Sequence, residues 1–153
     1  MAIRGGTTLM IINFSLQVLR DLMYFRDKEN LAVITDHGVI EKLSRLARTE
    51  DELLRSNLAL AISSCSDWSK NRATFGQSGA VGPLVTYLNS SSDLEVRQNT
   101  TLALYQLSKD PWNCVTMHQS GVVLHLLRLI GNFYRQTLFI HFTLVPGKNI
   151  YRI

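Results

Sequence analysis

The chain has 153 residues, of which 46% are hydrophobic and 18% are charged, and its net charge is +4. This length and composition suit one folded domain with a sizeable core and exclude an intrinsically disordered chain. No run of five or six basic residues occurs, so we expect no nucleic-acid partner. No stretch of about 18 apolar residues occurs either, so we expect no membrane partner. Only three prolines and nine glycines interrupt the chain, which favours an all-α fold.

Cysteine and histidine usage argues against metal sites and catalysis. Cys65 and Cys114 are the only cysteines and lie far apart, which indicates a reducing, cytoplasmic setting without a disulfide framework. The four histidines and two cysteines lack the paired spacing of a zinc site, so we expect no metal. No glycine-rich phosphate loop is present, and no nucleophile has a base fixed nearby by the sequence. We therefore expect no cofactor, no catalytic residue and no enzyme activity.

An internal repeat organises the sequence. Ser78–Val81 recurs 42 residues later as Ser120–Val123, a period within the range of armadillo and HEAT units. The match continues without a gap over a long stretch that includes Asn57 on Asn99. One unit earlier, the shift is one residue shorter. The recurrent glycines are Gly38, Gly79 and Gly121, and the recurrent asparagines are Asn30, Asn71 and Asn113.

The repeat divides the chain into five segments. Residues 1–29 are expected to carry the third helix of a partial repeat. Residues 30–70 and 71–112 read as two armadillo-like units of three helices each, and 113–131 as a further partial unit. Residues 132–153 show no helical stripe, and we predict a strand-like or irregular tail that is foreign to the repeat.

Within a unit, the first short helix follows the asparagine, which is a natural N-cap. The recurrent glycine ends that helix and permits a tight reversal with φ above zero. The second helix is predicted over Val81 to Leu88, because its apolar residues follow i, i+3, i+4, i+7 spacing. Those residues are Val81, Leu84, Val85 and Leu88.

The third helix is the longest of each unit. Thr49 and Ser92, each followed by a glutamate three residues later, predict capping boxes at its start. One apolar stripe per copy predicts its buried side. The stripes are Leu54, Leu58, Ala61, Ile62 and Cys65 in one copy, and Val96, Thr100, Ala103, Leu104 and Leu107 in the next. Such units cannot cover their apolar faces alone, so neighbouring units must stack.

Residues 79–85 read Gly-Ala-Val-Gly-Pro-Leu-Val and lie between Asn71 and a long helix. This arrangement resembles the armadillo repeat, and the resemblance extends over roughly residues 14–131. It implies an armadillo-type α–α superhelix with about two complete three-helix repeats between partial ones. It also implies a non-catalytic scaffold whose partners are other proteins.

Residues 56–62 and 98–104 are similar to armadillo-repeat proteins of motile cilia. This resemblance implies a role in assembling or docking outer dynein arms on ciliary axonemes. The implied partners are docking-complex subunits or other axonemal proteins, and the implied location is the axoneme.

The inner wall of such a solenoid is lined by third helices, whose face away from the core repeats a pattern of amides and leucines. The candidate partner-binding residues are Asn57, Leu60, Ser64, Asn99, Leu102 and Gln106. An extended segment or a helix could bind this face. The alternative is that these side chains are only the polar faces of helices.

Two other functions remain open from the residues. One is an importin-like or catenin-like adaptor that binds extended peptides. Armadillo proteins that carry nuclear cargo grip it with a Trp and an Asn, whereas this chain has Leu60 and Ser64 at those places, then Leu102 and Gln106. The other is a truncated isoform with little function of its own, because stacked repeats generally need about three units.

Overall fold

The computed structural model describes residues 2–24, 32–33 and 35–144. That part of the chain contains helices and no strand, which confirms the all-α prediction. The helices are α1 Ala2–Tyr24, α3 Val39–Leu46, α4 Glu52–Cys65, α5 Ser69–Gln77, α6 Val81–Ser90, α7 Leu94–Leu107, α8 Pro111–Gln119 and α9 Val122–Leu144.

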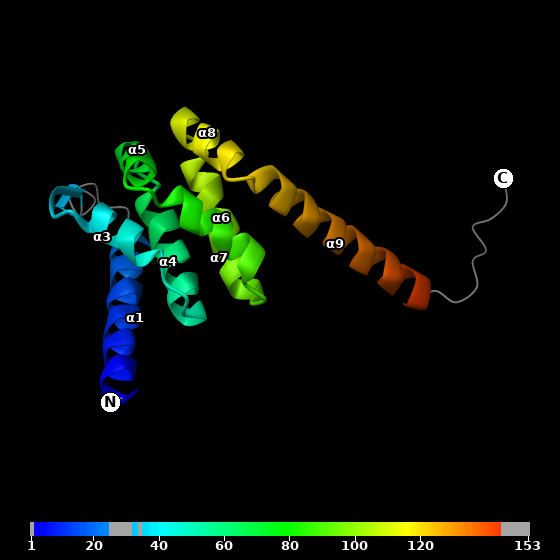
Figure 1. The fold of residues 1–153 in the computed structure, drawn as a ribbon, viewed down its shortest axis with the longest axis horizontal. Helices are drawn as coiled ribbons and strands as arrows, with labels where there is room; N and C mark the ends of the chain where they lie inside the picture. Colours follow the sequence, from blue (N-terminus) through cyan, green and yellow to red (C-terminus); the bar gives the residue numbers. More distant parts are fainter. Residues whose placement is uncertain (1, 25–31, 34, 145–153) are drawn as a thin grey trace.

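The helices stack in layers of one repeating plan. The long helices α1, α4 and α7 lie in a row, with α4 packed between the other two (Figure 1). The first helices α5 and α8 contact each other, and α6 packs against α7. The helices α5, α6 and α7 are therefore the first, second and third helices of one complete unit. The last helix, α9, runs away from this body (Figure 1).

The three recurrent glycines occupy the same corner of successive layers. The φ values are 65° at Gly38, 79° at Gly79 and 76° at Gly121. Each glycine lies one or two residues before the start of a second helix. An L-residue adopts this left-handed conformation only at a cost, whereas glycine adopts it freely. The predicted glycine turns are confirmed.

The buried residues follow the predicted stripes. All ten residues of the two third-helix stripes are buried, as are the four apolar residues of α6. They form one continuous core that also includes Phe75 of α5 and Tyr87 of α6. Stacking of the layers is therefore what removes these side chains from water, which is the main stabilising term of the fold.

The starts of the third helices differ from the prediction. Asp51 caps α4, since its Oδ1 accepts a hydrogen bond from Leu54 N at 2.7 Å. Asp93 caps α7 in the same way, through two backbone amides of the first turn. The capping boxes predicted from Thr49 and Ser92 are therefore wrong. Aspartate is as good an N-cap as serine and better than threonine, and its charge suits the positive end of the helix dipole.

Two of the recurrent asparagines, Asn71 and Asn113, are not N-caps. Asn71 and Asn113 lie inside α5 and α8, fully buried, and Asp110 is the side-chain cap of α8. The Nδ2 of Asn71 donates to Cys65 O at 2.9 Å, and the Nδ2 of Asn113 donates to Leu107 O at 3.1 Å. The last carbonyls of a helix lack partners within the helix, so each amide satisfies one at the end of the preceding third helix. Asn30 lies outside the described residues.

The segment after Gly131 is helical, so the prediction of a strand-like or irregular tail is wrong up to Leu144. No proline or second glycine follows Gly131 before Pro146, and one glycine inside a helix costs only about 1 kcal/mol. Residues 145–153 lie outside the described part of the chain. None of the described helices is long and apolar enough to cross a membrane.

Candidate protein-binding surface

The asparagines of the predicted inner face join neighbouring third helices. The Nδ2 of Asn57 in α4 donates to Asn13 Oδ1 in α1 at 2.9 Å. The Nδ2 of Asn99 in α7 donates to Ser56 Oγ in α4, also at 2.9 Å. We call these four residues the amide ladder. Asn57 and Asn99 are only half-buried, but each uses its side chain to connect two layers.

The other four predicted site residues differ in how available they are. Ser64 Oγ donates to the carbonyl of Leu60 within α4, and both residues are half-buried. Gln106 accepts a hydrogen bond from the Lys109 ammonium group. Leu102 is the most exposed of the six, at 43%. Binding of a partner by this set stays a prediction.

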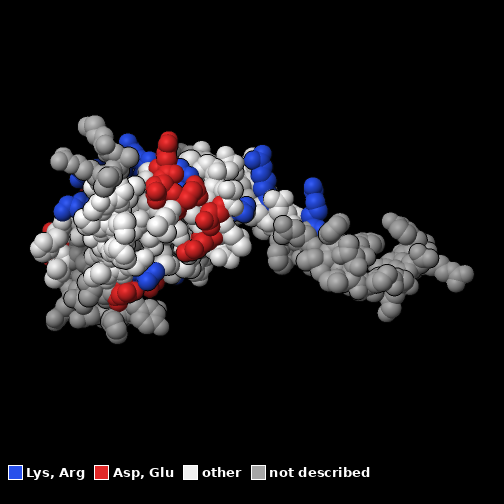
Figure 2. Space-filling model, turned by 90° about the horizontal axis from the view of Figure 1, so that it is seen from below, with Lys and Arg blue, Asp and Glu red and all other residues white. Residues whose placement is uncertain are grey.

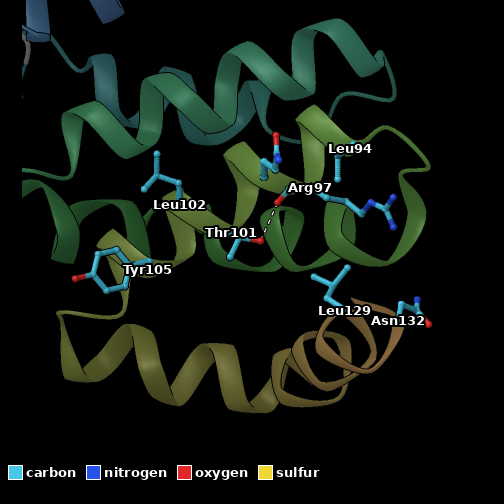
Figure 3. A pocket seen from close by; sticks show the side chains of 8 residues that line it. Leu94, Arg97, Thr101, Leu102, Tyr105, Leu129 and Asn132 are labelled. Carbon is cyan, nitrogen blue, oxygen red and sulfur yellow. Dashed lines mark hydrogen bonds between the residues drawn. The ribbon is translucent and has the colours of Figure 1, made fainter. Parts of the chain in front are cut away.

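A groove of about 890 Å³ lies between α7 and α9 (Figure 3). Its lining residues are Leu94, Arg97, Gln98, Thr101, Leu102, Tyr105, Leu129 and Asn132. Figure 3 shows Leu129 and Asn132 on α9, opposite the side chains that α7 contributes. The Thr101 hydroxyl donates to Arg97 O of its own helix at 2.8 Å. Of the six predicted residues, only Leu102 lines this groove.

The groove lies where no described helix covers the face of α7 that corresponds to the α7-facing side of α4. Ala59 and Ser63 of α4 are buried, whereas their counterparts 42 residues later, Thr101 and Tyr105, are exposed. Tyr105 is 60% exposed. Sequence reasoning missed Tyr105, although the repeat contained the signal: a large aromatic side chain replaces a small one at the repeated position.

Arg97 contributes the charge of the groove. Its Nε is buried without a hydrogen-bond partner among the described residues, and its Nη2 is 3.4 Å from Ser92 O. A buried guanidinium nitrogen without a partner loses its hydration and gains little in return.

The two thiols lie in different environments. Burial raises the pKa of Cys65 to about 12, so this thiol remains protonated at neutral pH. Cys114 is exposed, and its thiol donates to Ser108 O at 3.0 Å. The described part of the chain contains no group of three or more His, Cys, Asp or Glu residues that could hold a metal ion.

The charged side chains form no large basic surface on the face seen in Figure 2. Acidic side chains gather there, at the end of the body where α4 and α7 begin. Each of these helices has an aspartate cap and a glutamate in its first turn. Negative charge at these positions stabilises the helix starts, so this acidic band has a structural explanation.

Comparison with known proteins identifies the class. Residues 69–109, which span α5 to α7, match the Armadillo/beta-catenin-like repeat. A designed armadillo repeat protein superposes with a TM-score of 0.65 over 76% of this chain and 50% of that chain, at 20% identity. The chain therefore has the fold of an armadillo-type α-solenoid, and its residues 69–109 match one repeat of that family. Stacked helical repeats of this kind present extended surfaces to which other proteins bind.

Two known proteins are similar in sequence to parts of this chain. The Armadillo repeat-containing protein gudu of Drosophila melanogaster is 49% identical over 107 residues, which are 70% of this chain and 16% of that protein. Outer dynein arm-docking complex subunit 2 of Bos taurus is 57% identical over 47 residues, which are 31% of this chain and 4% of that protein. The chain thus corresponds to a small part of either relative.

Proposed function

We propose that this chain is a non-catalytic protein-interaction scaffold that helps to dock outer dynein arms on ciliary axonemes. The observation that carries the ciliary part is the 57% identity to a subunit of the outer dynein arm-docking complex. The scaffold part rests on the armadillo fold, whose third helices form a continuous wall. The proposed location is the axoneme, and the proposed partners are docking-complex or other axonemal proteins.

The exposed side chains of α7 are the best candidates for contact with such a partner. Leu102 and Tyr105 are both well exposed and line one end of the groove, whereas Arg97 lies toward the other end, near Leu94 and Leu129 (Figure 3). Aromatic and arginine side chains carry much of the energy of protein interfaces. Asn57 and Asn99 instead hold the layers together, so we assign them to the shape of the wall more than to direct contact.

A binding experiment with axonemes tests the proposal. The purified chain should co-sediment with axonemal doublet microtubules that retain their docking complexes, and the variant Tyr105→Ala should bind at least about tenfold more weakly. The matched control is Trp112→Ala, which removes another exposed aromatic side chain outside the groove. Equal binding by both variants, or no binding by the unmodified chain, contradicts the proposal.

A second measurement tests the location and the adaptor alternative together. Antibodies against the chain should label motile axonemes along their length. Labelling confined to nuclei, together with micromolar binding of a basic nuclear-localisation peptide, would refute the ciliary assignment and favour an importin-like adaptor.

A further inference from the structure

The helix α1 corresponds to a third helix, and no described helix covers its face that lies away from α4. The amide ladder gives its register, since Asn13 accepts from α4 as Ser56 accepts from α7. Ile11 and Val18 then correspond to core positions of α4 that are at most 2% exposed. In α1 these two side chains are 61% and 57% exposed. These two apolar side chains occupy positions that are buried in α4 but are open to solvent in α1.

At the other end of the molecule, first and second helices are described but a third helix is not. The first helix is α8 and the second helix is α9. Three core residues of α6 are at most 5% exposed, whereas their counterparts 42 residues later in α9 are 52–61% exposed. The residues of α6 are Val81, Val85 and Leu88, and those of α9 are Val123, Leu127 and Ile130.

We propose that two copies of the chain associate head to tail, with α1 of one copy lying in the groove between α7 and α9 of the other. The join completes one three-helix unit from two incomplete ones. It also continues the row of α1, α4 and α7, so the same packing already occurs twice within each copy. Ile11 and Val18 would be buried against the exposed residues of α9.

The side chains at the join match in polarity. In the register of the ladder, Met10 and Phe14 of α1 correspond to Glu95 and Asn99 of α7, which both approach Ser56 of α4. Met10 and Phe14 would therefore face α7 of the second copy. Both are more than half exposed, and the groove that would receive them has mainly apolar walls, including Leu94 and Tyr105. Apolar contact replaces the polar contact that joins α4 to α7.

This contact joins two different surfaces, so each pair retains a free head and a free tail. Association should therefore continue beyond the dimer as the concentration rises. Sedimentation velocity of the full chain should show a mass that grows with concentration from the 17.3 kDa of one copy.

Two single-face variants test the proposal. Val18→Glu alters only the head and Leu127→Glu only the tail, and each should abolish self-association because each places an unpaired charge in the contact. Both side chains are more than half exposed, so circular dichroism should show an unchanged fold. The matched control is Val115→Glu, a valine of similar exposure (49%) on the side of α8 that faces α5, and it should associate as the unmodified chain does.

Mixing the two variants gives the decisive result. Val18→Glu keeps an intact tail and Leu127→Glu keeps an intact head, so the mixture should form a 1:1 pair and nothing larger. A single 17.3 kDa species of the unmodified chain at every concentration would overturn the proposal. So would association of the unmodified chain without pairing of the mixed variants, since that result indicates contact between identical faces. A second copy and an axonemal partner would compete for this groove. These measurements use the pure chain, so their outcome does not depend on binding to axonemes.

Discussion

Two of the places where a third helix lies near the next second helix, α4 with α6 and α7 with α9, share one backbone arrangement but differ in their side chains. Between α4 and α6, Arg55 donates to Glu52 at 2.7 Å and to Thr49 O at 2.9 Å, and its guanidinium lies 5.0 Å from the centre of the Tyr87 ring. The Tyr87 hydroxyl donates to Ala47 O, and burial raises the pKa of this phenol.

Between α7 and α9, the counterparts of this network are Leu94, Arg97 and Leu129. The arginine is kept, but the acid and the aromatic ring are replaced by leucines, and the groove opens there. The comparison teaches that the repeated residues set the fold. A few side chains between a third helix and the next second helix then determine whether that joint is closed or leaves a groove.

The largest expected contrast concerns the apolar side chains of the two joints. Leu88→Ala in α6 should lower the free energy of unfolding by about 2–4 kcal/mol, because this residue is buried. Ile130→Ala in α9, at the equivalent position, should change it by less than about 0.5 kcal/mol, because this residue is exposed. Urea unfolding of dilute samples, followed by circular dichroism, measures both. Equal losses would show that the second joint is closed in solution.

The first helices give a second contrast. A β-carbon on Gly76 of α5 would lie 1.8 Å from Asn113 Oδ1 of α8, and that amide is held by Arg72 O and Leu107 O. Gly76→Ala should therefore destabilise the chain by about 1–3 kcal/mol, since it displaces a buried hydrogen-bonded amide.

The control for this change is Gly82→Ala in α6, where an added β-carbon meets nothing within 4 Å. It should stabilise the chain by about 0.5–1 kcal/mol, the usual gain of alanine over glycine within a helix. Thermal melting compares the two. A melting temperature that falls equally in both variants would contradict the close approach of α5 and α8.

The arginines of the two joints, Arg55 and Arg97, should differ in how much they stabilise the chain. Arg55→Ala should cost about 1–2 kcal/mol, because it removes hydrogen bonds to Thr49 O and to Glu52. Arg97→Ala should be neutral within about 0.5 kcal/mol, because its buried Nε has no hydrogen-bond partner among the described residues. Chemical unfolding of the pair decides this. A larger loss for Arg97→Ala than for Arg55→Ala would reverse the assignment of the sealed and open joints.

The smallest perturbation is labelling of the thiols. Cys114, exposed on α8, should react with a maleimide at neutral pH in the folded chain, whereas Cys65 should react only after unfolding. Two effects protect Cys65: it is buried, and its pKa is raised to about 12. Mass spectrometry of the labelled peptides checks the result. Rapid labelling of both thiols would mean that α4 separates from its neighbours under native conditions.

Much of the fold followed from the repeat alone. The glycine corners and apolar stripes were predictable because each depends on one local requirement, a positive φ or a buried face. Asn71 and Asn113 were misread because the carbonyls that they satisfy belong to another helix. The segment after Gly131 was misread because its sequence shows no apolar stripe, and the prediction depended on one.

The candidate site was harder to predict, because exposure depends on which neighbours are present. Leu102 could be placed on the third helix from its spacing, and it does line the groove. Asn57 also recurs in the repeat and was predicted on the same face of a third helix, but its side chain contacts a neighbouring layer. No pattern within one helix distinguishes these two cases, since the difference arises only when layers stack.

The amide ladder also limits how the layers can slide. If α7 shifted along α4 by one helical turn, about 5.4 Å, its apolar stripe would still meet apolar side chains. Asn99, however, would leave Ser56, and Ser56 would leave Glu95, so half-buried polar groups would lose their partners. Hydrophobic packing alone tolerates such slippage, whereas these few polar contacts select one alignment of α1, α4 and α7.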